Sequence, residues 1–336
     1  MLCSPDPDLW RGRDDAVDGA NALRWHQIVK VWDGRSPMEG APALLGFACD
    51  EGVRRNAGRT GAAAGPRALR LALAPSAVQG LDVVYDCGDV VCEGGALEAA
   101  QQQFAARLRT LLDAGAFAVA LGGGHEIARG SFGAMAQHLG ARGTLPRIGI
   151  LNFDAHFDLR SPASGPSSGT PFREIAEWFR GQDVPFHYGV IGVSPTANTT
   201  ALFDFARSHG VAWVEDMDCD AEHLAALRGF VDDFVADVDV LYVSVCLDVF
   251  RAADAPGVSA PAAPGIDPGV AISLIRHVGA RCARARVRWL VAELAELNPM
   301  FDMDARTARL GARLVCELVA AGRLANAAIA AAGGVP

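Results

Sequence analysis

Short apolar runs alternate with longer segments of helical periodicity along most of this 336-residue chain. Most of the runs are continuous in apolar residues and lack the polar alternation of a half-exposed strand, so we expect strands buried on both faces. These strands are expected near residues 43–49, 81–86, 117–122, 148–153, 188–193, 211–215, 239–247 and 288–294. The alternation predicts an α/β fold with a mostly parallel central sheet that is covered by helices on both faces.

Helices are expected in the segments between these strands. The clearest lies at residues 95–114, where leucine and phenylalanine recur at helical spacing, and residues 268–286 and 304–322 have the same character. The alanine-rich residues 320–332 are interpreted either as a short terminal helix or as a frayed tail. Because ligands of parallel sheets bind at the carboxyl ends of the strands, polar motifs that directly follow an apolar run are the candidates for a functional site.

The chain has no clear internal linker and no internal repeat, which favours one large domain. Residues 1–40 are polar and dotted with tryptophan, and we expect them to form an N-terminal arm. Residues 41–330 are expected to form a single domain, and a hydrophobic content of 51% is enough for a large core.

Charge and targeting features exclude several classes of protein. The net charge is -9 and no long basic run occurs, which argues against nucleic acid as a partner. The first residues lack the apolar segment of a secretory leader, and no stretch is expected to span a membrane. The eight cysteines form no CxxC pair and are interpreted as reduced, mostly buried thiols. We therefore expect a cytoplasmic protein without a membrane partner.

The strongest chemical signal is the sequence DAHFD at residues 154–158, directly after an apolar run. Alternate residues of a strand point the same way, so Asp154, His156 and Asp158 would converge on one side of the strand end. Two carboxylates and an imidazole at this spacing are a set of metal ligands. The alternative is a plain polar turn, which would crowd two acids together without a compensating cation.

A glycine-rich sequence, GGGHE at residues 122–126, also follows an apolar run. Its glycines let the backbone pass close to another group, and His125 would lie where a helix begins. Such a turn can cradle a phosphate, but no GxGxxG or Walker pattern follows. The remaining alternative is a capped turn with a surface histidine.

Two further motifs place carboxylates after strands. In SVCLD at residues 244–248, Cys246 and Asp248 are two residues apart and so share one strand face. AELNP at residues 295–299 supplies Glu296. The nearby Glu293 either shares the site or flanks the strand, and the second interpretation is favoured. Since all four motifs follow strands, we expect one pocket that contains His125, Asp154, His156, Asp158, Asp248 and Glu296.

These motifs, in this order, resemble the signature set of the ureohydrolases, the family of arginase, agmatinase and formimidoylglutamase. The resemblance extends from Gly46 to beyond Pro299, which is most of the chain, and residues 52–66 are more loosely similar to the family's first active-site loop. It implies an arginase-like fold, a three-layer α/β/α sandwich, and usually two manganese ions.

Within this family, the details are most similar to those of formimidoylglutamases. They are DLR at residues 158–160, SGTPF at residues 168–172, and DVF at residues 248–250 followed by APGVSAP. This resemblance implies hydrolysis of N-formimino-L-glutamate to L-glutamate and formamide, in histidine breakdown. The alternatives are another ureohydrolase, acting on agmatine or a guanidino acid, and a metal-poor relative without activity. The partner would be a small-molecule substrate, and a homo-oligomer is expected.

Carried over by motif, the resemblance assigns a role to each pocket residue. His125 and Asp158 would bind one metal ion, His156 and Asp248 would bind the other, and Asp154 would bridge them. Asp158 would also pass a proton to the leaving nitrogen.

Glu296 would pair with the cationic amidine of the substrate. Arg160 and Ser168 are expected to bind the rest of the substrate, since Arg160 can hold a carboxylate in bidentate form. The same arginine would repel agmatine.

Cys246 departs from the family pattern, which usually has a second bridging aspartate at this position. A thiolate could replace the lost charge, but it is softer and binds zinc at about 2.3 Å rather than the roughly 2.0–2.2 Å of a carboxylate. Cys246 is therefore either a metal ligand or a neutral buried thiol, and the number of bound manganese ions depends on which it is.

Overall fold

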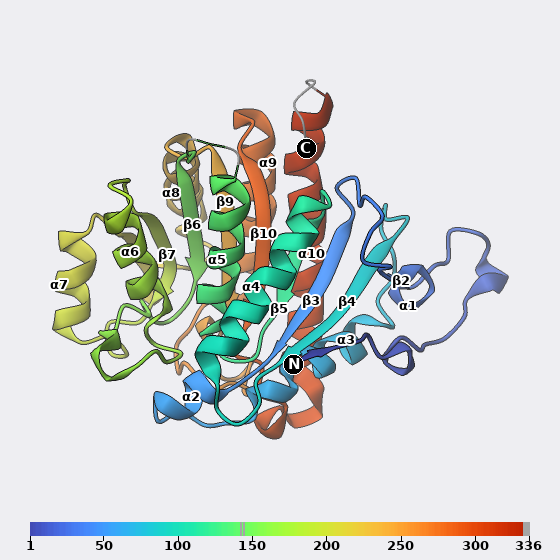
Figure 1. Cartoon of the computed structure of the whole chain (residues 1–336), viewed down its shortest axis with the longest axis horizontal. Helices are drawn as coiled ribbons and strands as arrows, with labels where there is room; N and C mark the ends of the chain where they lie inside the picture. Colours follow the sequence, from blue (N-terminus) through green and yellow to red (C-terminus); the bar gives the residue numbers. More distant parts are fainter. Residues whose placement is uncertain (142, 144, 332–336) are drawn as a thin grey trace.

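The computed structural model describes residues 1–141, 143 and 145–331 (Figure 1). One central sheet has the strand order β1-β4-β3-β5-β10-β9-β6-β7-β8, and β2 pairs with β4 outside this path. Apart from the antiparallel pair of β1 and β4, all described pairings are parallel. The strands are β1 (Leu2–Cys3), β2 (Val29–Val31), β3 (Pro42–Ala48), β4 (Val84–Val91), β5 (Phe117–Leu121), β6 (Ile148–Phe153), β7 (His187–Val193), β8 (Ala212–Glu215), β9 (Val240–Cys246) and β10 (Arg288–Ala295).

Helices cover both faces of this sheet, with α4 and α5 in front of it and α9 and α10 behind it in Figure 1. One apolar layer contains residues of α3 (Gly65–Leu73), α8 (Leu224–Ala236), α9 (Pro268–Ala285) and α10 (Arg306–Ala331). The other contains residues of α4 (Leu97–Asp113), α5 (Ile127–Gly140), α6 (Pro171–Gly181) and α7 (Thr200–Ser208). The structure also has two short helices, α1 (Trp25–Ile28) and α2 (Glu51–Arg55). The predicted three-layer α/β/α sandwich is confirmed.

The central strands β5, β6 and β9 are buried along their whole length because helices pack on both of their faces. This explains why their sequences are apolar without alternation. The helix signals are also local: α9 begins after Asp267, whose side chain accepts a hydrogen bond from the Gly269 N–H at 2.7 Å, with Pro268 in its first turn.

A strand was expected at residues 81–86, but the observed strand, β4, begins at Val84 and ends at Val91. Its later part looked unlike a strand because it contains Asp86 and Asp89. Both carboxylates pair with the buried Arg70 of α3, at 2.9 Å and 2.7 Å respectively. The ion pairs with a helix that is distant in sequence thus allow these two acids to lie within a strand.

The N-terminal residues add two strands that the sequence did not predict. β1 and β2 both pair with β4, and Trp25 between them is only 1% exposed. The segment therefore packs along one side of the sheet and also sends out the projecting loop drawn in dark blue in Figure 1. The division into an arm of residues 1–40 and a domain of residues 41–330 stays a prediction.

The last helix, α10, is longer than the expected 304–322 and includes the alanine-rich segment up to Ala331. Residue 332, the end of that segment, lies outside the described residues. Contrary to the expectation, residues 303–331 are long and apolar enough to cross a membrane by length and composition alone. In the fold, α10 packs against α9, α3 and β10, and its apolar stripe forms part of the core.

Candidate metal centre

The four sequence motifs meet at the carboxyl ends of four neighbouring strands, β5, β10, β9 and β6. A cavity of about 320 Å³ opens at this edge. The side chains that line it include His125, His156, Asp158, Arg160, Ser168, Cys246, Asp248 and Glu296. Asp154 is fully buried beneath them. The structure thus brings all of the predicted site residues to one place.

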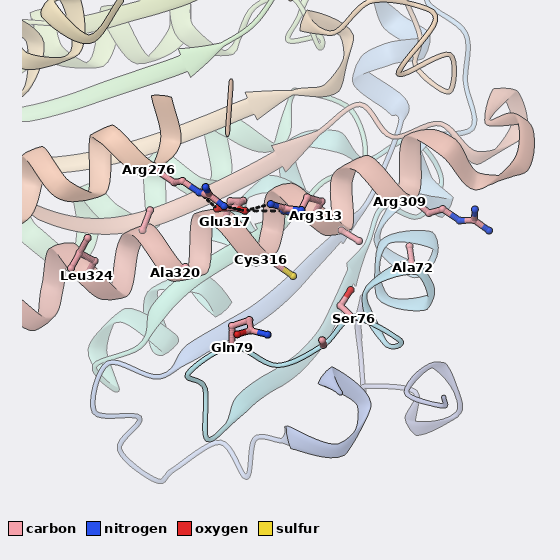
Figure 2. A pocket seen from close by; sticks show the side chains of 13 residues that line it. Ala72, Ser76, Gln79, Arg276, Arg309, Arg313, Cys316, Glu317, Ala320 and Leu324 are labelled. Atoms are coloured by element: carbon pink, nitrogen blue, oxygen red, sulfur yellow. Dashed lines mark hydrogen bonds and ion pairs between the residues drawn. The ribbon is translucent and has the colours of Figure 1, made fainter. Parts of the chain in front are cut away.

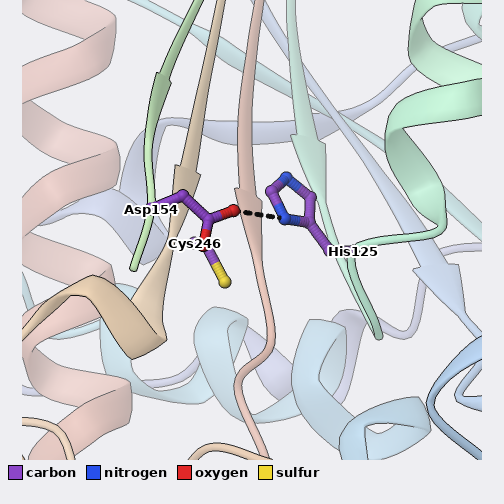
Figure 3. Close-up of side chains that lie close together, drawn as sticks. All are labelled: His125, Asp154 and Cys246. Atoms are coloured by element: carbon purple, nitrogen blue, oxygen red, sulfur yellow. Dashed lines mark ion pairs between the residues drawn. The ribbon is translucent and has the colours of Figure 1, made fainter. Parts of the chain in front are cut away.

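The first group of possible ligands surrounds His125. Its Nδ1 atom lies 2.9 Å from Asp154 Oδ2 and 2.9 Å from Asp158 Oδ2. Cys246 joins this group, since one ligand atom each from His125, Asp154 and Cys246 lie within 4.8 Å of one another (Figure 3). The thiol therefore points toward the same space as the histidine and the carboxylate.

The second group surrounds His156. Its Nδ1 atom lies 3.2 Å from Asp248 Oδ2 and 3.5 Å from Asp154 Oδ1. One ligand atom each from Asp154, His156 and Asp248 lie within 4.8 Å of one another. Asp154 belongs to both groups and presents a different oxygen to each, which is the arrangement of a bridging ligand.

The DAHFD residues converge for a different reason from the one expected. β6 ends at Phe153, so Asp154, His156 and Asp158 lie in a loop and not on a continuing strand. The turn is held by the Asp154 side chain, which accepts hydrogen bonds from the His156 N–H at 2.7 Å and from Asn152 Nδ2 at 3.0 Å. Asp158 has a φ of 48°, a left-handed conformation that is uncommon for non-glycine residues.

The glycines of GGGHE bring the β5–α5 loop against the end of β3. A Cβ atom on Gly123 would lie 1.8 Å from the carbonyl oxygen of Cys49, so only glycine fits there. The N–H groups of Gly123 and Gly124 donate to Phe47 and Cys49 at 2.9 Å and 3.0 Å. This close contact fixes the loop that carries His125.

The concentration of acids perturbs the site strongly. Burial and the neighbouring Asp154 charge raise the pKa of Asp158 to about 6. Burial acts to lower the pKa of His125, but Asp154 and Asp158 hold it well above its ordinary value. Burial, with Asp154 and Asp248 nearby, raises the pKa of the Cys246 thiol far above normal. Such like-charge crowding is relieved by a cation, which would also favour the thiolate.

Three buried polar atoms at the cavity have no hydrogen-bond partner among the described residues: His125 Nδ1, Asp248 Oδ1 and Glu296 Oε2. Buried polar atoms are nearly always satisfied, so each of these points to a missing ligand. Imidazole nitrogens and carboxylate oxygens suit manganese and other first-row divalent ions. The residues present therefore fit a pair of bound metal ions.

Glu296 is held in position by the backbone around it. Its Oε1 atom accepts a hydrogen bond from the His125 N–H at 2.9 Å, and its own N–H donates to the Gly123 oxygen at 2.8 Å. Its φ of 71° is again left-handed. These constraints leave Oε2 facing the cavity, where burial raises the pKa of Glu296 well above its ordinary value.

The outer part of the cavity carries Arg160, which is exposed, and Ser168, which is 8% exposed. The Ser168 hydroxyl accepts a hydrogen bond from Asn56 Nδ2 at 3.2 Å. Asn56 also lines the cavity, although no individual role was expected for it within the loop of residues 52–66. Arg59 lies nearby, but its guanidinium group donates to the backbone oxygens of Val258 and Ser259.

One sequence interpretation is wrong. Glu293 does not flank its strand: it is fully buried within β10 and accepts hydrogen bonds from neighbouring side chains. By contrast, all eight cysteines are free thiols and most are buried, as expected.

A larger cavity, about 720 Å³, lies elsewhere, in a surface groove between α3, α9 and α10 (Figure 2). Its one acid, Glu317, is already paired with Arg276 and with Arg313, at 2.7 Å each. The groove holds none of the possible metal-ligand groups of the described residues. Size alone therefore does not identify the site, whereas chemistry does.

Comparison with known proteins agrees with this assignment. The arginase family matches residues 41–321, and the chain belongs to that family. It is 52% identical over 320 residues to the formimidoylglutamase of Ralstonia nicotianae, covering 95% of this chain and 97% of the relative. It is 48% identical to that of Aeromonas salmonicida, covering 92% and 96%.

Solved structures show the same fold. A formimidoylglutamase from Bacillus subtilis superposes with a TM-score of 0.78 at 22% identity, covering 90% of this chain and 93% of the other. A Trypanosoma cruzi formiminoglutamase solved with Mn2+ gives a TM-score of 0.75 at 24% identity, covering 90% and 99%. The expected arginase-like fold is confirmed.

Proposed function

We propose that this arginase-family protein hydrolyses N-formimino-L-glutamate to L-glutamate and formamide, with two manganese ions at the carboxyl edge of the sheet. The bond between the formimino carbon and the glutamate nitrogen breaks, and the oxygen of water ends in formamide. One observation carries the proposal: Asp154 is shared by two ligand groups directly beside Arg160, Ser168 and Glu296. The names of relatives that are about half identical to this chain agree with it.

Each ion would be held by three or more protein groups. One set is His125, Asp158 and Cys246, the other is His156 and Asp248, and Asp154 contributes to both. When bound, such a pair of cations lowers the pKa of water and so supplies a nucleophile near neutral pH. Even without Cys246, each set keeps three ligands, which is enough for a catalytic ion.

Asp158 would manage the proton that this reaction transfers. Its side chain lines the cavity, and its Oδ2 atom lies 2.9 Å from His125 Nδ1. A carboxylate in this place can take a proton from water and give it to the leaving nitrogen of glutamate.

Glu296 would hold the amidine of the substrate. Its Oε2 atom is buried, unpartnered and directed into the cavity, so a cationic N–H donor would satisfy it. Because Glu296 Oε1 is already used by the His125 N–H, the carboxylate cannot rotate freely. The fixed orientation would place the reacting carbon above the two ligand groups.

Arg160 and Ser168 would bind the glutamate part of the substrate. The substrate carries two carboxylates, and Arg160 lies exposed at the cavity with no acidic partner among the described residues. An arginine can bind a carboxylate through two parallel hydrogen bonds. Agmatine, the cationic substrate of the alternative ureohydrolase activity, would be repelled by the same group.

We also propose that the protein acts in the cytoplasm and forms a homo-oligomer. The free state of all eight cysteines suits a reducing compartment.

Exposed Met300 and Met303, 75% and 71% accessible, offer apolar surface for a second copy. Light scattering of the purified protein measures the oligomeric state directly.

A substrate panel with added manganese tests the proposed activity. The panel contains N-formimino-L-glutamate, agmatine, arginine and guanidino acids, and the assay scores formamide, ammonia and urea. Formamide released only from N-formimino-L-glutamate is the expected result. Urea from a guanidino substrate would establish the alternative activity, and no product from any compound would favour a relative without activity.

A further inference from the structure

Glu293 is an acid in the middle of the core, on β10, three residues before Glu296. It is 0% exposed and does not line the metal cavity. Its carboxyl group accepts hydrogen bonds from Tyr242 OH at 2.7 Å and Ser244 Oγ at 2.9 Å, both through Oε1, and from Ser131 Oγ through Oε2. A buried carboxyl group is costly, so a strand position filled this way calls for an explanation.

The register of the sheet brings Glu293 beside Ser244. The two residues are direct partners in the parallel pairing of β10 with β9. Ser244 Oγ in turn lies 2.9 Å from His125 Nε2, and Glu293 Oε1 lies 3.9 Å from the same nitrogen. A continuous path of hydrogen bonds thus runs from Glu293 through Ser244 to the ring of His125.

The donors in this path have only one consistent direction. The Ser244 hydroxyl has a single hydrogen, and it donates that hydrogen to the Glu293 carboxyl group. Ser244 must then accept from His125, so Nε2 carries the ring proton. The lone pair of His125 is left on Nδ1, the atom that faces Asp154 and Asp158. A metal ion can bind only a nitrogen that is free of its proton.

Packing alone does not determine this tautomer. Phe172 meets the His125 ring edge-on, with ring centroids 5.3 Å apart, and so restricts its tilt. A phenyl ring offers no hydrogen-bond acceptor that distinguishes Nδ1 from Nε2 in this way. The Ser244 hydroxyl is the group that does.

We propose that Glu293, acting through Ser244, is a positioning residue that holds His125 in its Nε2–H tautomer and so strengthens metal binding by Nδ1. The inference rests on the proposed function only in requiring a metal centre at His125. Hydrogen-bond partners behind a ligating histidine commonly change metal affinity by about 10–100-fold.

Two serines provide a matched pair for the test. Ser131 and Ser244 are both fully buried and both donate to Glu293, but only Ser244 also contacts His125. The dissociation constant of Mn2+ is measured on the whole protein by titration, with free Mn2+ counted from its electron paramagnetic resonance signal. Thermal midpoints report how much stability each variant loses.

Ser244→Ala is expected to weaken Mn2+ binding about 10–100-fold, while Ser131→Ala stays within about threefold of the unmutated protein. Both variants should lose similar thermal stability, since each removes one donor to Glu293. Glu293→Leu should weaken Mn2+ binding as Ser244→Ala does, and if that variant does not fold, the serine pair decides alone.

Equal Mn2+ affinities in the two serine variants would overturn the role of Glu293 and Ser244, because a purely structural network predicts that result. If the unmutated protein itself bound no Mn2+, the metal centre of the proposed function would fail together with this inference. The affinity is measured without substrate, so a wrong substrate assignment leaves the test intact.

Discussion

Two clusters of buried charge, one between α3 and β4 and one at the carboxyl edge of the sheet, differ in how completely their atoms are satisfied. Between α3 and β4, Arg70 is 1% exposed and Asp86 is 0% exposed. The Asp86 carboxylate accepts hydrogen bonds from Arg70, from Trp10 Nε1 at 2.8 Å and from the Gly88 N–H at 3.1 Å. Every charge there has its counterpart.

At the carboxyl edge of the sheet, by contrast, several polar atoms of the acids and imidazoles are left without a partner. His125 Nδ1, Asp248 Oδ1 and Glu296 Oε2 have no hydrogen-bond partner within the described structure. The comparison teaches that burial of charge alone does not mark a functional site. What marks it is buried charge with atoms left over for a ligand.

The sharpest test of the comparison is Arg70→Ala. Removing one partner of a buried ion pair leaves Asp86 charged and unpaired, so we expect the free energy of unfolding to fall by about 3–5 kcal/mol. Urea denaturation of the metal-free protein measures this loss. Folded Arg70→Ala should still bind Mn2+ normally. A loss of unfolding free energy below about 1 kcal/mol would show that the α3–β4 cluster does not stabilise the fold.

Asp154→Asn should lower activity and metal binding more than it lowers the unfolding free energy. It removes the carboxylate that both ligand groups share, so we expect kcat/KM to fall by more than about 100-fold, beyond the usual 10–100-fold effect of residues that only support ligands. Metal analysis should find fewer bound ions, while the unfolding free energy changes less than in Arg70→Ala. Retained activity with a full metal complement would remove Asp154 from the centre.

Arg160→Ala tests the outer part of the cavity. There the proposed partner of the arginine is a carboxylate of the substrate and not an acid of the protein. Loss of a hydrogen bond to a charged group costs about 1.5–3 kcal/mol, so KM for N-formimino-L-glutamate should rise by roughly 10–100-fold. Metal content should stay unchanged. Arg173→Ala is the control, since Arg173 contacts Glu177 on the exposed side of α6. An unchanged KM in Arg160→Ala would exclude this arginine from the site.

Cys246 is expected to give the smallest effect, because each ion keeps three other ligands. Cys246→Asp should tighten Mn2+ binding by restoring a carboxylate bridge, and Cys246→Ser should weaken it if sulfur is a ligand. Titration with Mn2+ measures both. If neither variant changed the affinity, the thiol would be a neutral buried group, despite its position beside His125 and Asp154.

The parts of this molecule that local sequence determines were predictable. Strands buried on both faces have continuous apolar sequences, which is why β5, β6, β9 and β10 were expected close to their true bounds. The four motifs that follow them could be placed at one edge because parallel strands end on the same side. The order of parallel strands thus accounts for the meeting of the four motifs, whereas Arg160 and Ser168 lie in loops and were expected from the family resemblance.

The parts that depend on distant contacts were not predictable in the same way. The polar part of β4 is a strand because Arg70 of another helix pairs with its acids. Glu293 looked like a flanking residue because its partners, Ser131 and Tyr242, come from α5 and β9. Asn56 gained its place only through Ser168, far along the chain.

Metal dependence tests the central claim most directly. The protein is freed of metal with a chelator, titrated with Mn2+, and assayed for formamide released from N-formimino-L-glutamate. The account predicts no formamide from the metal-free protein and full recovery as about two ions bind per chain, one for each ligand group. Full formamide release from a demonstrably metal-free preparation would contradict it.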